Sequence, residues 1–354
     1  MDTVKVELGD RGYPVHVGRG LLARLSEWTS ALSPARAALL YDDGVPFSLL
    51  DRAARALEAA GFSLARVTVR AGEASKCLEK AEQVLDELVD AGLDRSSPLF
   101  VMGGGMVCDL GGFCAAVLYR GVPLVLLPTT LLAQLDAAIG GKTAVNLLAG
   151  KNLVGAFWQP RLVVADIDAL ATLPSAELCA GLAEAVKCGL VGDPGLLDRL
   201  EAQAEQVVAG DLALLHDIVL RAVRVKAAIV ARDERETGDE RIWLNLGHTV
   251  GHALEASGDL RHGQAVALGL VAAVRVGRRL GVTPADLEGR IVRLLSALGL
   301  PTNLDEKVAA GGLEAMSIDK KRLGAAIRFV CIRAPGQPMV VPLSPAEVLE
   351  NLRA

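Results

Sequence analysis

The sequence predicts an α/β domain followed by a mainly α-helical domain. Short β-rich runs alternate with helical segments up to about residue 174, as expected for parallel βαβ units in a doubly wound sheet. Three consecutive glycines follow one buried strand, and beyond Pro174 nearly every segment has helical periodicity. We therefore expect two closely packed domains, 1–174 and 175–354, with a ligand site in the cleft between them.

In the first domain, strands are predicted from compact or alternating apolar runs, and helices from apolar residues at helical spacing. The run 4–17 alternates and ends in Gly-Arg-Gly, so it predicts strands joined by a turn. The helix expected at 48–61 ends at a glycine, the usual stop signal. Further strands are expected at 37–41, 64–69, 98–102 and 122–127, and a second helix at 74–91.

The second domain is predicted to be helical except near its end. Its amphipathic segments are the expected helices 176–191, 194–208, 212–233, 244–256, 263–280 and 284–298. Two short β-rich runs, 327–333 and 339–342, are the only strands expected there.

Composition argues against several classes of protein. The 354 residues carry a net charge of −5 and are 51% apolar but only 3% aromatic, so Ala, Val and Leu must build the core. An acidic balance without a Lys/Arg-rich run argues against nucleic-acid binding. No secretory signal or long uninterrupted apolar run is found, so no membrane span is expected. Six scattered cysteines favour free thiols in a reducing cytoplasm, and we expect an enzyme of that compartment.

Two glycine-rich segments are candidate anion sites. Gly103-Gly104-Gly105 follows a strand and opens a helix, where the backbone can approach a pyrophosphate. Cys108 stands at the third glycine position of the dinucleotide fingerprint, so a tight strand-to-helix turn is the alternative. Asp42 and Asp43 follow an earlier strand and are placed to bind a ribose. The segment 140–143 is Gly-Gly-Lys-Thr but lacks the first glycine of a P-loop, so we reject a nucleotide triphosphatase.

Three of the five histidines, His248, His252 and His262, fall close together in the sequence. His248 and His252 are four apart on a predicted helix, so they share a face and can share a ligand. Catalytic zinc takes three protein ligands, with imidazole a common donor. We expect the carboxylate ligand to be Glu184, with Lys187 on the same helix face. The alternative is core histidines and an ordinary Glu–Lys helix pair.

Lysine usage indicates an anionic substrate. The chain has 27 Arg but only 10 Lys, so its generic surface cation is arginine. Lys226 lies at the margin of an apolar helix stripe, where a solvated lysine is not expected. Seven lysines lie in the segments marked by glycine, histidine or acidic residues, and we expect them to surround a small, highly anionic substrate: Lys76, Lys142, Lys151, Lys187, Lys226, Lys320 and Lys321.

Taken together, these segments resemble the 3-dehydroquinate synthases, the shikimate-pathway branch of the sugar phosphate cyclases, from about residue 42 to residue 342. So many ordered motifs at compatible spacing are far more specific than any one of them. The motifs are Gly72-Glu73-x-x-Lys76, Gly103-Gly104-Gly105-x-x-x-Asp109, Tyr119-Arg120-Gly121, Pro128-Thr129-Thr130-Leu131-Leu132, Asp136, Gly140-Gly141-Lys142-Thr143, Lys151-Asn152, Ala183-Glu184-x-x-Lys187, Arg241-x-x-x-Asn245-Leu246-Gly247-His248-Thr249, His252, His262-Gly263 and Asp319-Lys320-Lys321.

The resemblance implies a Rossmann-like NAD-binding domain, a helical metal-binding domain and a homodimer. It implies zinc or cobalt on Glu184, His248 and His262, with His252 at the substrate instead of the metal. The implied NAD site comprises Asp42, Glu73, Lys76, Gly104, Gly105, Asp109, Thr129, Thr130, Asp136, Lys142, Lys151, Thr172 and Glu177. The implied substrate residues are Asp136, Lys142, Lys151, Asn152, Lys187, Lys226, Arg241, Asn245, His252 and one of Lys320 and Lys321. Arg120 is implied to reach the substrate phosphate of the neighbouring subunit.

The resemblance also implies a reaction on 3-deoxy-D-arabino-heptulosonate 7-phosphate, a seven-carbon keto-acid phosphate. NAD takes a hydride from its C5 alcohol, phosphate leaves by β-elimination, and the hydride returns. The ring then opens and an intramolecular aldol step closes 3-dehydroquinate.

Some positions depart from the family pattern. Gly44 replaces a usual asparagine, Ala137-Ala138 a serine pair, Ala144 a glycine and Gln264 a glutamate. The loop between Glu255 and His262 also looks short. These changes concern cofactor affinity, loop length and the support of the metal, but they remove neither a metal ligand nor an anion-binding lysine.

Three alternatives remain open. Another sugar phosphate cyclase, such as an epi-valiolone synthase, usually changes residues matching Asn245, His252 or 319–321, although an amino-dehydroquinate synthase keeps them. A polyol dehydrogenase that uses NAD and a metal shares the glycine turn but does not need the whole set Lys142, Lys151, Asn152, Lys226 and Arg241. A catalytically inactive subunit is disfavoured by the intact metal and lysine sets.

Overall fold

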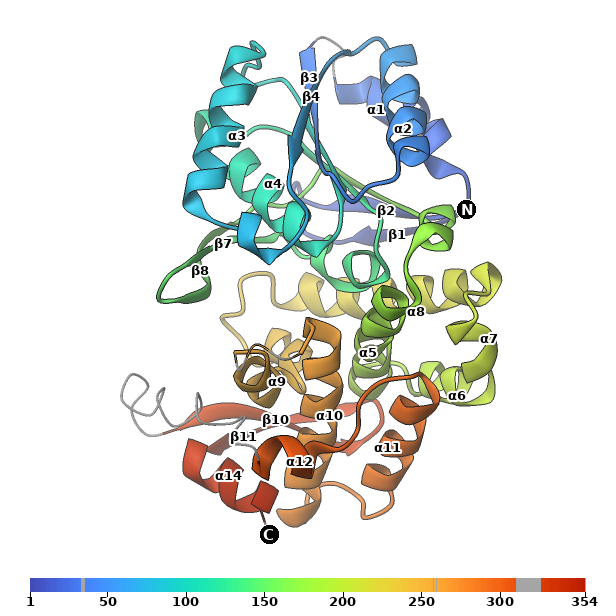
Figure 1. The fold of residues 1–354 in the computed structure, drawn as a ribbon, viewed down its shortest axis with the longest axis vertical. Coiled ribbons are helices and arrows are strands. Elements are labelled where there is room, and N and C mark those ends of the chain that lie inside the picture. Colours follow the sequence, from blue (N-terminus) through green and yellow to red (C-terminus); the bar gives the residue numbers. More distant parts are fainter. Residues whose placement is uncertain (33–35, 257, 259, 310–325, 354) are drawn as a thin grey trace. The chain divides into compact units, whose positions relative to one another are not determined.

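The computed structural model describes residues 1–354 except 33–35, 257, 259, 310–325 and 354 (Figure 1). The chain divides into two compact units, Met1–Leu173 and Pro174–Ala354. Across the described residues, no helix is both long enough and apolar enough to span a membrane.

The first unit is built on a seven-stranded sheet. Six of its strands run parallel, and β1 pairs antiparallel with β2 at one edge. In spatial order the strands are β1 (Asp2–Val6), β2 (Tyr13–Gly18), β9 (Leu162–Asp166), β6 (Leu124–Pro128), β5 (Leu99–Gly103), β3 (Arg36–Asp42) and β4 (Ser63–Val69). The central strands are fully buried on both faces, which explains why they appear in the sequence as continuous apolar runs.

Helices cover both faces of this sheet, so the predicted doubly wound fold is confirmed. Figure 1 shows α1 (Ser26–Thr29) and α2 (Phe47–Ala59) on one side, and α3 (Leu78–Asp90) and α4 (Gly105–Val117) on the other. On the α2 side, Leu57 belongs to the same buried cluster as Leu39 of β3 and Phe100 of β5.

The order of the strands determines where a ligand site can form. Strand β4 lies on one side of β3 and β5 lies on the other, so the winding direction reverses between β3 and β5. In open α/β sheets, ligands bind beyond the carboxyl ends of the strands at such a reversal. Asp42 ends β3 and Gly103 ends β5, which places both of these predicted residues there.

Several element predictions for the first unit were wrong in detail. The helix expected at 74–91 begins at Leu78, because a short 3₁₀ turn (Glu73–Ser75) and an extended Cys77 precede it. Strand β9 was not predicted from the sequence. The hairpin formed by β7 (Lys142–Leu147) and β8 (Gly150–Phe157) was not predicted either. Leu147, Leu153 and Phe157 of this hairpin are exposed and its strand pairing is irregular, so polar and apolar residues do not alternate regularly along it.

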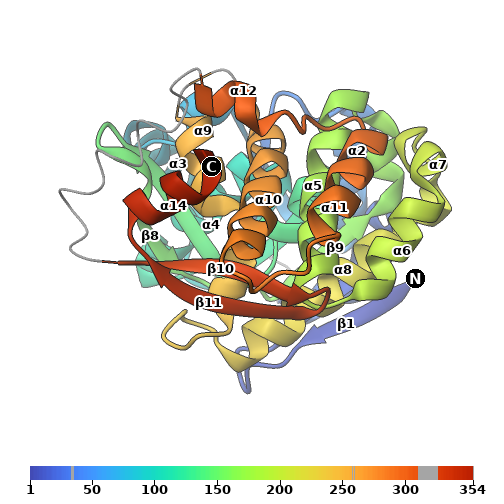
Figure 2. The ribbon, with the colours of Figure 1, turned by 90° about the horizontal axis from the view of Figure 1, so that it is seen from below.

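The second unit is mainly helical, as predicted. Its helices are α5 (Ser175–Val191), α6 (Pro194–Ala202), α7 (Ala204–Val208), α8 (Leu212–Arg232), α9 (His248–Glu255), α10 (His262–Arg279), α11 (Leu287–Ala297), α12 (Leu304–Ala309) and α14 (Pro345–Arg353). The strands β10 (Ile327–Ala334) and β11 (Gln337–Leu343) form an antiparallel hairpin. In Figure 2, α10 runs between α11 and α14, with this hairpin crossing it.

Two predicted helices of this unit are each interrupted. The helix expected at 194–208 breaks at Gln203 into α6 and α7. The one expected at 244–256 is a 3₁₀ helix, η7 (Arg241–Asn245), followed by α9. Gly247, at φ 79°, separates them, and a side chain there would meet the backbone of Leu270. This glycine lets α9 begin against α10 with His248 as its first residue.

Candidate functional site

The glycine turn after β5 is held by a buried carboxylate. Asp42 Oδ2 accepts a hydrogen bond from Gly104 N at 3.2 Å, and its Oδ1 accepts one from Gly44 N at 3.1 Å. Burial raises the pKa of Asp42, and these two backbone N–H groups oppose that rise. Gly103, at φ 148°, has no room for a side chain, because a Cβ atom would lie 2.2 Å from Asp42 Oδ2. The Asp42 carboxylate therefore fixes the backbone of the glycine turn through these hydrogen bonds.

The other predicted residues of this turn lie together. Thr129 N donates to Gly103 O at 2.9 Å, which joins the end of β6 to the turn. Thr130 packs beside Gly104, and its Oγ1 accepts a hydrogen bond from Ala133 N. Cys108 occupies the position of the third fingerprint glycine, but Gly111, one turn further along α4, allows the same close packing of helix on strand. Gly111 lies so close to Val101 that a Cβ atom would be 2.6 Å from it, so α4 packs tightly on the sheet.

A second cluster forms around Lys76, which is 4% exposed. Its Nζ donates to Asp109 Oδ2 at 2.5 Å and to Asn152 Oδ1 at 2.6 Å. Burial raises the pKa of Asp109, and the Lys76 ammonium opposes that rise. Three segments far apart in the sequence thus place their predicted residues within hydrogen-bonding distance of one another.

The remaining predicted cofactor residues are more dispersed. Lys142 and Lys151 are exposed on the β7–β8 hairpin, separated by about four strand positions or roughly 14 Å. Asp136 lies in the single helical turn Ala133–Ala137 after β6. The Thr172 hydroxyl donates to Ala169 O, and Glu177 lies in the second unit.

The second unit brings the predicted metal ligands together. Glu184 Oε1, from α5, lies 3.5 Å from His248 Nε2 of α9 and 3.7 Å from His262 Nε2 of α10. The three ligand atoms all lie within 4.8 Å of one another. Lys187, one helical turn after Glu184, places its Nζ 2.5 Å from Glu184 Oε2, as the shared helix face predicted. Both side chains are 1% exposed.

The chemistry of these side chains fits a divalent metal such as zinc or cobalt. Burial, with the nearby Lys187 charge, lowers the pKa of His248 to about 3, so its imidazole is neutral and can donate a lone pair. Burial alone would lower the pKa of His262, but hydrogen bonds to Glu184 and Glu255 raise it to about 10. The cluster therefore attracts positive charge, and one carboxylate with two imidazoles is a known zinc ligand set.

Sequence reasoning missed Glu255. Its Oε2 lies 3.2 Å from His262 Nδ1, the ring atom that faces away from Glu184. His248 is fixed in a similar way, since its Nδ1 lies 3.2 Å from Leu246 O. Such contacts orient metal-binding imidazoles. The available signal was spacing, because Glu255 follows His248 and His252 at seven and three residues on the same helix.

The histidine pair predicted from helix spacing requires a correction. The rings of His248 and His252 are adjacent, with centroids 5.3 Å apart, but no candidate metal group among the described residues contains both. His252 instead belongs to a second group with Glu255 and His262. Tertiary contact with α10, which spacing within α9 could not reveal, decides which histidine joins Glu184.

Predicted substrate residues lie on elements that pack against α5. Lys226 of α8 is 6% exposed and Arg241 of η7 is 2% exposed, and α5, α8 and η7 contact one another. Asp233 accepts hydrogen bonds from the backbone N–H groups of Thr237, Gly238 and Arg241, which closes the loop before η7. Asn245 Nδ2 donates to Glu236 Oε1 at 3.0 Å.

The structure describes the predicted residue Arg120 but not the predicted segment 319–321. Arg120 is exposed and follows Tyr119, and both adopt left-handed backbone conformations, at φ 67° and 50°. Non-glycine residues in this conformation are strained and are concentrated at functional sites. The segment Asp319-Lys320-Lys321 lies outside the described residues.

The substituted Gln264 has a structural role at the start of α10. Its Oε1 accepts a hydrogen bond from Arg261 N at 3.1 Å, which caps the helix that begins with His262. Arg261 in turn pairs with Glu177 at 2.8 Å. Glutamine therefore supplies the capping oxygen that a glutamate would supply.

The packing of α10 on α5 leads to a prediction for Gly263→Ala. A Cβ atom at Gly263 would lie 2.0 Å from Ala180 O, so alanine must push α10 away from α5 next to His262, a predicted metal ligand. We expect a loss of about 1–3 kcal/mol in unfolding free energy and weaker zinc binding. Denaturant unfolding and zinc titration measure both effects. Gly289→Ala on α11 is the control, because only the flexible end of Arg293 lies near it, and it should be neutral or stabilising.

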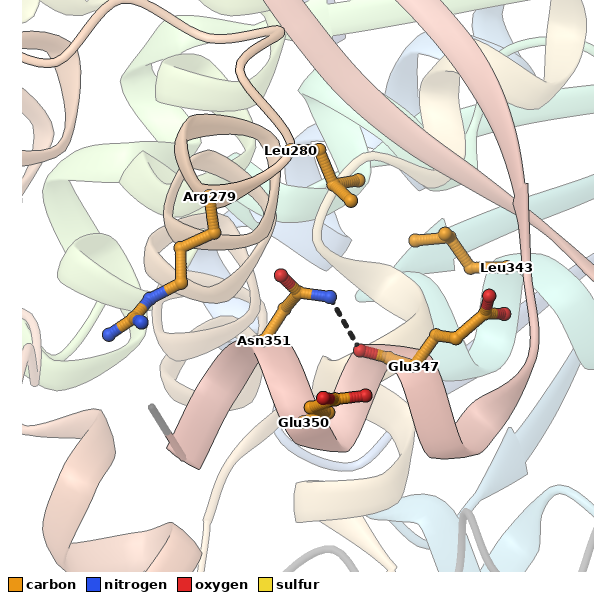
Figure 3. Close-up of a pocket in the computed structure, with 6 residues that line it drawn as sticks. All are labelled: Arg279, Leu280, Leu343, Glu347, Glu350 and Asn351. Carbon is orange, nitrogen blue, oxygen red and sulfur yellow. Dashed lines mark hydrogen bonds between the residues drawn. The ribbon is translucent and has the colours of Figure 1, made fainter.

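A pocket of about 550 Å³ lies elsewhere in the second unit (Figure 3). Arg279, Leu280, Leu343, Glu347, Glu350 and Asn351 line it. Arg279 ends α10, about 25 Å along the helix from His262, so this pocket is separate from the candidate metal ligands.

Comparison with known proteins assigns the chain to a family. Family profiles described as 3-dehydroquinate synthase N-terminal and C-terminal match residues 66–180 and 181–322. The 3-dehydroquinate synthase of Symbiobacterium thermophilum is 49% identical over 99% of both chains. The chain belongs to the 3-dehydroquinate synthase family.

Solved structures of sugar phosphate cyclases share the family fold. A 2-deoxy-scyllo-inosose synthase complexed with carbaglucose-6-phosphate, NAD⁺ and Co²⁺ has a TM-score of 0.87 at 23% identity and covers 99% of each chain. A 2-epi-5-epi-valiolone synthase from Streptomyces hygroscopicus with NAD⁺ and Zn²⁺ bound has a TM-score of 0.85 at 27% identity, covering 99% of this chain and 98% of that one.

Proposed function

We propose that the chain is a 3-dehydroquinate synthase that converts 3-deoxy-D-arabino-heptulosonate 7-phosphate to 3-dehydroquinate and phosphate, using NAD and a divalent metal. The observation that carries the proposal is the cluster of Glu184, His248 and His262 beside the buried Lys187. Full-length identity of 49% with a 3-dehydroquinate synthase supports the same assignment.

The first unit supports NAD as one cofactor. The glycine turn at the β3/β5 reversal presents backbone N–H groups and the start of α4, which suit a pyrophosphate. Thr129 and Thr130 border this turn, and the Lys76–Asp109–Asn152 cluster supplies polar groups from neighbouring segments. When bound, NAD accepts a hydride from the C5 alcohol and later returns it.

The second unit supports the metal and an anionic substrate. Glu184, His248 and His262 would hold the ion, which when bound lowers the pKa of the C5 hydroxyl. Lys187, Lys226 and Arg241, each at most 6% exposed, would hold the carboxylate and phosphate and offset charge that develops as phosphate leaves. His252 is exposed beside the metal ligands, in a position suited to the substrate phosphate.

The proposal includes a homodimer in the cytoplasm. Arg120 would reach the substrate phosphate of the neighbouring subunit, which would account for its exposed side chain and left-handed backbone. The six free cysteines suit a reducing compartment, and four of them are buried, with at most 2% of each residue exposed.

The test is phosphate release from 3-deoxy-D-arabino-heptulosonate 7-phosphate with NAD and zinc or cobalt, with product mass as a second readout. We expect one phosphate per product molecule of the mass of 3-dehydroquinate. A parallel assay measures NADH formation with glycerol as the substrate, and accumulation of NADH would indicate a polyol dehydrogenase. Phosphate release only from a heptulose 7-phosphate or the amino analogue would identify a different cyclase.

A further inference from the structure

Asn146 connects the β7–β8 hairpin to the segment that follows β4. Its Nδ2 donates to Glu73 Oε1 at 2.7 Å, and its Oδ1 accepts from Asn152 N at 2.9 Å. Its backbone N donates to Lys76 O at 2.8 Å, and an isolated bridge joins it to Cys77. One side chain thus contacts two residues of the proposed cofactor and substrate sites, and its backbone contacts a third.

The hairpin is irregular at this residue. The strand pairing steps from Val145↔Val154 to Leu147↔Gly150, so Asn146 alone faces the three residues 151–153 of β8. Such irregularities redirect side chains and leave backbone groups without ladder partners. Asn152 lies within this bulge at φ 57°, and Asn146 Oδ1 satisfies its N–H group. The Asn152 side chain is thereby directed to Lys76 Nζ.

The contacts require an amide at position 146. Glu73 offers an acceptor and the Asn152 N–H group is a donor, so the bridging side chain must donate on one side and accept on the other. Aspartate could accept from Asn152 but would place a second negative charge beside Glu73. Alanine would make neither contact.

We propose that Asn146 is a positioning residue that fixes Glu73 and Asn152, and through Asn152 the Lys76 ammonium, in the geometry that binds NAD. Asn146 acts without touching the cofactor. The inference rests on the proposed function for the identity of the ligand, but the hydrogen-bond network it invokes is a property of the free protein.

The experiment compares Asn146→Asp, Glu73→Gln and the double variant N146D/E73Q with the unaltered chain. NAD affinity is measured by calorimetry, and hairpin order by amide hydrogen exchange across residues 142–157 without NAD. We expect Asn146→Asp to weaken NAD binding about tenfold and to speed exchange in the hairpin. The double variant should recover much of the NAD affinity and of the slow hydrogen exchange, because glutamine at 73 can donate to the new carboxylate at 146. Asn351→Asp is the control, since that partly exposed amide lies in the second unit, outside the hairpin, and donates to Glu347 O.

The outcomes separate this inference from the proposed function. Unchanged NAD affinity and exchange in Asn146→Asp would overturn it. The inference would also be overturned if the losses in NAD affinity of the two single variants added in the double variant, because Asn146 would then not act through Glu73. If the unaltered chain binds NAD but releases no phosphate from the keto-acid phosphate, the proposed substrate fails while the role of Asn146 stands. If it binds no NAD, hydrogen exchange in the same variants still decides whether Asn146 orders the hairpin.

Discussion

Replacing Glu184 with glutamine is expected to abolish tight metal binding and, with it, phosphate release. Glu184 is fully buried, and its Oε1 lies within 3.7 Å of both His248 Nε2 and His262 Nε2. Glutamine keeps the shape but removes the negative charge that compensates a dication. Mutating a residue that only orients a metal ligand typically lowers metal affinity about 10–100-fold. We therefore expect the loss of Glu184, a proposed ligand itself, to lower metal affinity by more than about 100-fold.

Chelator competition and metal content of the purified protein measure this effect. Glu184→Asp, which keeps the charge but shortens the side chain, provides a second variant in case the glutamine form folds poorly, and circular dichroism checks the fold of both. Glu205→Gln on α7 is the control, because that side chain is exposed. Zinc bound to Glu184→Gln with unchanged affinity would show that the metal lies elsewhere.

Replacing Lys187 with methionine is expected to destabilise the metal-free protein strongly. The Lys187 ammonium and the Glu184 carboxylate form a buried pair at 2.5 Å. Removing one partner of such a pair costs about 3–5 kcal/mol, and we expect the lower end because His262 also faces Glu184. Bound zinc supplies a replacement cation, so the loss should be smaller in the metal-saturated protein.

Denaturant unfolding of Lys187→Met with and without zinc tests this expectation. Lys5→Met is the control, since the Lys5 side chain is 62% exposed and pairs with Glu7 at the surface. Equal losses in the two metal states would contradict the idea that Lys187 and the ion both neutralise Glu184. Activity should fall in either case, because Lys187 is proposed to hold the substrate.

Local sequence determined most of the elements. The buried runs of β3, β5 and β6 and the long amphipathic helices α2, α5, α8 and α10 were placed close to their observed bounds. The strands are buried on both faces and appear as continuous apolar runs, and the helices bury wide apolar faces, so both patterns are clear in the sequence. The β7–β8 hairpin was missed because the exposed residues of β8 include Leu153 and Phe157, so polar and apolar residues do not alternate regularly along it. The α9 boundary was missed because Gly247 separates two helical segments that the sequence shows as one.

The chemistry-bearing residue types were also apparent from the chain itself, including the glycine turn, the histidine cluster and the selective use of lysine. The tertiary structure decided which of them meet. Glu184, His248 and His262 come from three helices, and only the packing of α5, α9 and α10, permitted by Gly247 and Gly263, brings their ligand atoms within 4.8 Å. Asn146 and Glu255 were not recognised, because each acts through a hydrogen bond to a residue on another segment. Periodicity reports burial along one element, whereas a site depends on distances between elements, which side-chain packing alone sets.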